Sequence, residues 1–186
     1  MRFLRAILGN VSEQAGEPDH ADSDHVMVSL VVLYDTYIEL DLDALRQALD
    51  DVFPGEFLPP REQGSFVIDG AVPGATFMIK SAVKGAAGLF MLNNVPGPYT
   101  EFSDFADIAD PALRDRAEQQ SCWLSVDLTH PTASVEEAYC FIGKVLARIA
   151  PDDAALLVHP ETLRSMVFDE NVRDRLSCGE LVFAVQ

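Results

Sequence analysis

Two short motifs place aspartate and histidine where they could take part in acid–base chemistry. Asp127-Leu128-Thr129-His130 ends a run that is typical of a strand, and His159 follows the next such run. Strand ends carry many active sites, and a carboxylate can orient an imidazole that acts as a general base. If both strands end at one edge of a sheet, Asp127, His130 and His159 could form the site of a small hydrolase. The alternative is that these residues only stabilise the turns in which they stand.

A second group of polar residues near the start of the chain has the composition of a metal site. His20, Asp22, Asp24 and His25 supply two imidazoles and two carboxylates, which are ligand types that zinc accepts. All four stand on one polar segment with Gly16 and Pro18, so no scaffold fixes their geometry. An acidic loop without a metal is therefore the preferred interpretation, and we expect no cofactor.

Common catalytic signatures are missing from the sequence. It contains no P-loop, no dinucleotide-binding glycine motif, no G-x-S-x-G elbow and no H-E-x-x-H pair. Its three cysteines lie far apart, and an odd count is typical of a reducing compartment. We expect Cys122 to pack in the core beside Leu124 and Val126, and Cys140 to lie opposite the apolar stripe of its helix.

Charge is the strongest compositional signal. The net charge is -17, from 13 basic and 30 acidic residues, and it argues against binding to a phosphate backbone. Residues 10–56 hold most of this imbalance, with Arg46 as their only base. An acidic surface can attract a basic protein, although it can also serve only to keep a protein soluble. The residues predicted to form such a partner-binding surface are Asp35, Glu39, Asp41, Asp43, Asp50 and Asp51.

Length and hydropathy bound the class of protein. With 186 residues, 48% of them hydrophobic, the chain can bury an ordinary core without disulfides or a structural metal. We expect an N-terminal arm and acidic loop over residues 1–25 and a single domain over residues 26–186. No apolar stretch is long enough to span a bilayer, and the first residues lack a cleavage site, so a cytoplasmic location is expected.

The elements that would position these residues follow from the apolar periodicity. Residues 26–34 are almost continuously apolar, which predicts a strand in the middle of a sheet with both faces covered. Residues 42–52 then repeat leucine with helical spacing, after Asp41 as the expected N-cap. Three strands are predicted at residues 65–68, 75–80 and 88–93, separated by turns that contain glycine.

The second half of the chain alternates predicted helices and strands. Asp110-Pro111 predicts a helix that runs to about Gln119, and residues 121–128 predict a strand. The clearest helical pattern covers residues 134–149, where Ser134 and Glu137 form a capping box. We further expect a short strand at residues 154–158, a helix from Pro160 to about residue 168 whose start could hold an anion, and a last strand at residues 181–185.

This order of elements predicts an α+β fold with a mixed, mainly antiparallel sheet and helices packed on it. One stretch has a further pattern: a strand led by glycine, the Val95-Pro96-Gly97-Pro98 loop, a helix, the strand with Trp123 and a long amphipathic helix. Over about residues 85–160 the chain thereby resembles a family of uncharacterised bacterial domains. His130 only loosely matches the histidine that the family carries after the tryptophan. The resemblance implies an α+β fold and no particular activity.

Taken together, the sequence predicts a non-enzymatic binding or regulatory protein of a bacterial cytoplasm. Its acidic surface would engage a basic protein, as an inhibitor or immunity protein does. The alternative is a small hydrolase or other enzyme that uses the Asp127, His130 and His159 site. A subunit of a homo-oligomer is a third hypothesis, while nucleic acid and membranes are not expected as partners.

Overall fold

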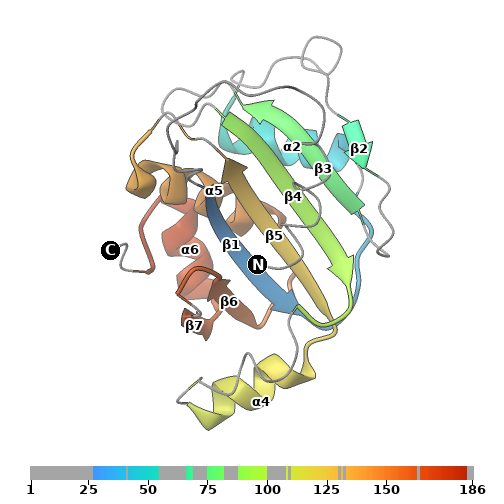
Figure 1. Ribbon diagram of the computed structural model, residues 1–186, viewed down its shortest axis with the longest axis vertical. Coiled ribbons are helices and arrows are strands. Elements are labelled where there is room, and N and C mark those ends of the chain that lie inside the picture. Colours follow the sequence, from blue (N-terminus) through green and yellow to red (C-terminus); the bar gives the residue numbers. More distant parts are fainter. Residues whose placement is uncertain are drawn as a thin grey trace, which may run out of the picture.

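The computed structural model describes residues 27–40, 42–54, 66–68, 75–81, 88–99, 108, 110–129, 131, 133–162 and 164–183. The elements of this part, in chain order, are β1 (Met27–Tyr34), α2 (Leu42–Val52), β2 (Phe66–Ile68), β3 (Ala75–Ser81), β4 (Gly88–Pro96), α4 (Pro111–Gln119), β5 (Cys122–Thr129), α5 (Val135–Ile149), β6 (Leu156–His159), β7 (Arg164–Val167) and α6 (Glu170–Ser177). The strands form one sheet in the order β2-β3-β4-β5-β1-β6-β7 (Figure 1). Their pairings are antiparallel, so the predicted α+β fold with a mainly antiparallel sheet is confirmed.

The first strand, β1, lies inside the sheet between β5 and β6. Its residues from Val28 to Tyr34 are all buried, as the continuous apolar run predicts. Successive side chains of a strand point to opposite faces. Leu30 and Val32 therefore belong to a large core cluster on one face, while Val31 and Leu33 belong to a smaller cluster on the other.

Of the helices in the described ranges, three cover the face with the large cluster. Buried residues of α2, α5 and α6 pack in that cluster with the sheet, and the three helices lie behind it in Figure 1. The predicted capping box begins α5: the Glu137 N–H donates to the Ser134 hydroxyl at 3.2 Å, and the Ser134 N–H donates to the Glu137 carboxylate at 3.1 Å. The predicted helices at residues 42–52 and 134–149 are thus confirmed.

The helix α6 is fastened to the end of α5 by an arginine. Arg173 donates to the carbonyl oxygens of Ala147 at 3.1 Å, Ala150 at 3.0 Å and Pro151 at 2.8 Å. Its guanidinium also lies over the ring of Phe168, 5.1 Å from the centroid. These carbonyls belong to the last turn of α5 and the residues just after it, where carbonyl groups lack partners within the helix.

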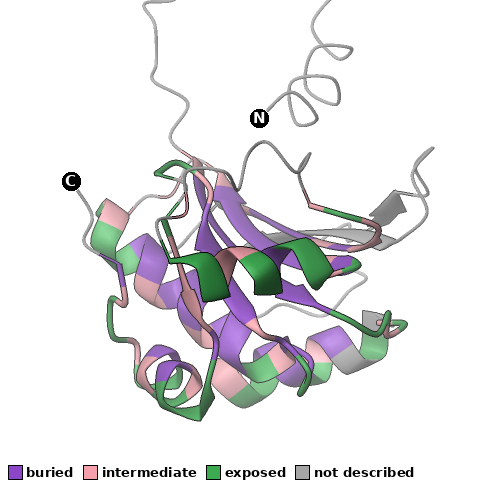
Figure 2. Ribbon diagram, turned by 90° about the horizontal axis from the view of Figure 1, so that it is seen from below, coloured by how far each residue is buried: buried purple, intermediate pink, exposed green. Residues whose placement is uncertain are grey.

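The helix α4 packs on the opposite face. Its Ala117 lies in the smaller cluster with Leu156 and Val158 of β6, whereas most of its other residues are exposed, as Figure 2 shows. The predicted start of this helix is confirmed, because Asp110 is the N-cap and its carboxylate accepts from the Ala112 N–H at 2.9 Å.

The C-terminal part corrects two predictions. Residues 160–168 were expected to form a helix, but β6 and β7 form a hairpin instead. Pro160 lies in its turn, where the Thr162 N–H donates to the His159 carbonyl at 3.3 Å. The hairpin is favoured over the helix because β7 pairs with the outer edge of β6, which would otherwise be left unpaired. The proposed anion site at that helix start is therefore wrong.

The expected last strand is also absent over residues 181–183, the part of it that the structure describes. Val182 and Phe183 instead pack their side chains against the large core cluster. Across the described ranges, no helix combines the length and the apolar character that crossing a membrane would require.

Candidate functional site

A buried carboxylate, that of Asp127 in β5, lies within the sheet. It is 1% exposed, and the ion pairs found among the described residues do not include it. Asp127 pairs with Ser29 of β1 on one side and with Met91 of β4 on the other. Its neighbours Val126 and Leu128 belong to the core cluster under α5, so Asp127 faces the opposite side of the sheet.

Hydroxyl and amide groups surround this carboxylate. The Ser29 hydroxyl donates to Oδ1, while Ser125 and Asn93 donate to Oδ2 at 2.8 Å and 3.0 Å. Asn93 also donates to the Ser125 hydroxyl at 3.0 Å. Burial raises the pKa of Asp127 to about 6, although the three hydrogen bonds favour its charged form. These four residues, the Asp127 cluster, hold a carboxyl group that titrates close to neutral pH.

His159 lies on the other face of the sheet. Its ring stacks on Tyr139 of α5, with 4.9 Å between centroids, and meets the edge of Phe183 at 5.4 Å. Leu157, two positions earlier in β6, lies in the core cluster under α5, as the alternation requires. Asp127 and His159 therefore point to opposite sides and do not converge. Asp127 and His159 therefore do not form the predicted hydrolase site together. The third predicted member, His130, lies outside the described residues.

The surroundings of His159 favour the neutral form of its ring. It is 3% exposed, and its Nδ1 lies 3.1 Å from the Thr162 hydroxyl. Burial lowers the pKa of His159, and the Glu161 carboxylate opposes this effect. A neutral ring that packs between two aromatic side chains is a structural histidine, which was the alternative interpretation of its motif.

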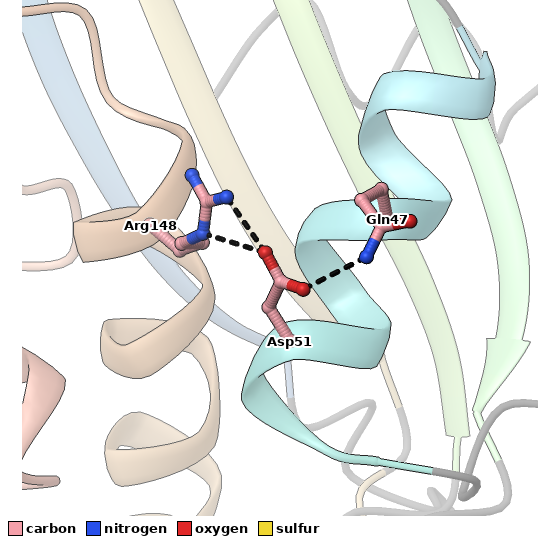
Figure 3. A network of polar contacts seen from close by, with 3 residues as sticks. All are labelled: Gln47, Asp51 and Arg148. Atoms are coloured by element: carbon pink, nitrogen blue, oxygen red, sulfur yellow. Dashed lines mark hydrogen bonds and ion pairs between the residues drawn. The ribbon is translucent and has the colours of Figure 1, made fainter.

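Part of the predicted acidic surface is bound within the molecule. Figure 3 shows the Asp51 carboxylate between α2 and α5, where it accepts from Arg148 Nη2 at 2.7 Å and from Gln47 at 2.8 Å. The hydrogen bond from Gln47, followed by those from Arg148, lowers the pKa of Asp51. Asp43 forms an ion pair of 3.2 Å with Arg46 in the same helix. The charges of Asp43 and Asp51 are thus partly compensated within the chain, while Asp50 is exposed on α2 and Asp41 is not described.

Asp35 lies elsewhere, at the end of the sheet where β1 ends and β5 and β6 begin. The Gln120 amide donates to its carboxylate at 3.0 Å. In the next residue, the Thr36 N–H donates to the Asp153 carboxylate at 2.9 Å. Asp35, Asp152 and Asp153 are exposed, and we call these three residues the acidic end. None of these three residues takes part in the ion pairs found among the described residues.

Asp152 and Asp153 were missed in the sequence. They stand in the turn between α5 and β6, and the contact with Thr36 joins positions 117 apart in the chain. No local pattern carries that information, since it depends on β6 pairing with β1. Glu39, which was predicted, is exposed in the loop that follows Asp35.

The predicted metal ligands and the cysteines do not form a site in the described part of the chain. Among the described residues, no three or more of histidine, cysteine, aspartate and glutamate gather as metal ligands would. His20, Asp22, Asp24 and His25 all lie outside those residues. Cys122 is buried in the core with Leu124 and Val126, as predicted. Cys140 is half-buried, and burial raises the pKa of its thiol.

Comparison with known proteins does not extend this description. The chain matches no protein-family model, no curated protein and no solved structure. The resemblance noted for residues 85–160 therefore stays a prediction, and the functional argument depends on the geometry of the molecule.

Proposed function

We propose that the protein is a non-enzymatic binding or regulatory protein, inhibitor-like or immunity-like, that docks on a basic protein surface. The acidic end is the contact surface in this proposal. The observation that supports it is that three exposed carboxylates, two from one turn and one from a distant loop, meet at one end of the sheet. Such a surface attracts cationic side chains and speeds the encounter with them.

Two of the three carboxylates of the acidic end are also held in place before a partner arrives. The Asp153 carboxylate accepts from the backbone N–H of Thr36, and the Asp35 carboxylate accepts from the side-chain amide of Gln120. Binding then costs less side-chain entropy than it would if these two carboxylates rotated freely. Each carboxylate keeps lone pairs for a lysine or arginine of the partner.

The ion pairs among the described residues do not include the carboxylates of the acidic end. Several of the described arginines are occupied elsewhere: Arg46 pairs with Asp43, Arg148 with Asp51 and Arg175 with Glu180. These three arginines are thus occupied away from the acidic end. We infer a cytoplasmic partner from the cysteine pattern.

A charge-matched pair of variants tests the proposal. The first variant neutralises the acidic end, with Asp35→Asn, Asp152→Asn and Asp153→Asn. The control neutralises the same number of exposed carboxylates on α5 and α6, with Glu136→Gln, Glu170→Gln and Asp174→Asn. Binding of a fluorescent oligolysine peptide is measured by anisotropy at low and at high salt.

The acidic-end variant should bind the peptide about tenfold more weakly than the control variant. Three exposed ion pairs of about 0.5 kcal/mol each sum to about 1.5 kcal/mol, which is about one factor of ten. Binding by the natural protein should weaken as salt is added. Equal losses in the two variants would show that net charge, not this surface, governs binding, and the proposal would fail.

A further inference from the structure

Two buried polar atoms beneath residues 180–183 have no hydrogen-bond partner among the described residues. They are the hydroxyl oxygen of Tyr139 in α5 and Nε2 of His159 in β6. Tyr139 is 4% exposed and His159 is 3% exposed, so bulk water does not solvate either group. Buried polar atoms are nearly always satisfied by protein or by ordered water, which makes a pair of unsatisfied atoms in contacting rings informative.

Both residues line the same small cavity. Leu30, Leu176 and residues 180–183 form the rest of its wall, and its water-accessible volume is about 10 Å³. That space is close to the minimum for one water molecule and is too small for a larger ligand. The cavity therefore offers a water-sized space beside two polar groups that need a partner.

The described groups around the cavity do not supply that partner. The Glu161 carboxylate and the backbone of Ser29 lie near enough to affect the pKa of Tyr139, but neither completes a hydrogen bond of normal geometry with its hydroxyl. The Glu180 carboxylate at the cavity wall is engaged by Arg175 Nε at 3.0 Å. The remaining wall is formed by aliphatic and aromatic side chains.

We propose that this cavity is a binding site for one water molecule, which donates to His159 Nε2 and accepts from the Tyr139 hydroxyl. His159 suits this role because its Nδ1 faces the Thr162 hydroxyl, so that the neutral ring can carry its proton on Nδ1 and accept at Nε2. The bound water links α5 to β6 under residues 180–183. This site is independent of the acidic end and of any partner that binds there.

Two measurements on the full-length protein test the site directly. A crystal structure at neutral pH should show an ordered water within about 3.2 Å of both atoms. Nitrogen-15 NMR of the histidine ring should show the proton of His159 on Nδ1, with Nε2 unprotonated. A cavity without density at high resolution, or a neutral ring protonated on Nε2, would overturn the proposal.

A variant adds an energetic test. Tyr139→Phe deletes the hydroxyl that donates to the water, and Tyr37→Phe deletes an exposed hydroxyl as the control. If the water is bound, Tyr139→Phe should increase the unfolding equilibrium constant by about fivefold or more relative to the control, since one satisfied buried hydrogen bond is lost. A variant more stable than the natural protein would mean that the hydroxyl has no partner, and the water site would be refuted.

Discussion

Replacing Asp127 by asparagine should remove a pH-dependent loss of folding stability. The carboxyl group is buried in the middle of the sheet, and its hydrogen bonds in the described part of the chain come from neutral donors: Ser29, Ser125 and Asn93. Asparagine has nearly the same shape, and the serine hydroxyls can rotate to accept from its amide. The substitution thus preserves packing while it removes the ionisable group.

The sign and size of the effect follow from the pKa. Burial raises the pKa of Asp127 to about 6 in the folded protein, whereas an aspartate in an unfolded chain has a pKa of about 3.9. Between these values the folded state keeps a proton that the unfolded state has released, so stability falls as the pH rises. Two pKa units correspond to about 3 kcal/mol in total, of which about 2 kcal/mol develops between about pH 4.5 and pH 7.5.

Urea unfolding of the natural protein and of Asp127→Asn over this pH range measures the effect. The stability of the variant relative to the natural protein should rise by about 2 kcal/mol towards the upper end of the range. Asp152→Asn, which removes an exposed carboxylate, serves as the control. A difference between natural protein and variant that stays constant with pH, or that declines, would refute the reasoning that burial dominates at Asp127.

Three further predictions concern single side chains. Burial lowers the pKa of His159, while the Glu161 carboxylate raises it and Arg164 lowers it further. The natural protein should therefore lose stability relative to His159→Phe as the pH falls below about 6.5. A stability difference that does not change with pH would contradict this. Arg173→Met should cost about 2–3 kcal/mol in urea unfolding, since it removes three hydrogen bonds to carbonyls, whereas Arg175→Met should cost less than about 1 kcal/mol; similar losses would argue against the fastening role. Ser134→Ala should cost about 1 kcal/mol by the same assay, and no loss would mean that the capping box is not needed.

Local patterns were sufficient for much of the fold. The apolar run of β1 and the capping box of α5 each lie within one short stretch, so the sequence predicts both elements and their burial. The β6–β7 hairpin was missed because Pro160-Glu161 has the local character of a helix start. Its structure is decided by pairing with a neighbouring strand, and propensity alone does not register that contact.

The candidate sites depended more on pairing than on local pattern. Asp127 was identified from the sequence, but its expected partnership with His159 was wrong, because the face on which a residue lies depends on its parity within each strand. Asp35 was predicted to be exposed and acidic, while Asp153 became visible only when β6 was placed beside β1. Residues that are close in the chain could be predicted, and residues joined by sheet pairing could not.

The position of β1 has a consequence for how the protein is made. During synthesis this almost wholly apolar strand leaves the ribosome well before β5 and β6, its two neighbours in the sheet; Ser29 and Asp127, which meet across the β1–β5 pair, are 98 positions apart. Pairings of such long range slow folding and leave an apolar edge exposed to other chains in the meantime. The nascent chain should therefore rely on chaperones until residue 129 and the residues of β6 have emerged, and expression at low temperature should increase the yield of folded protein.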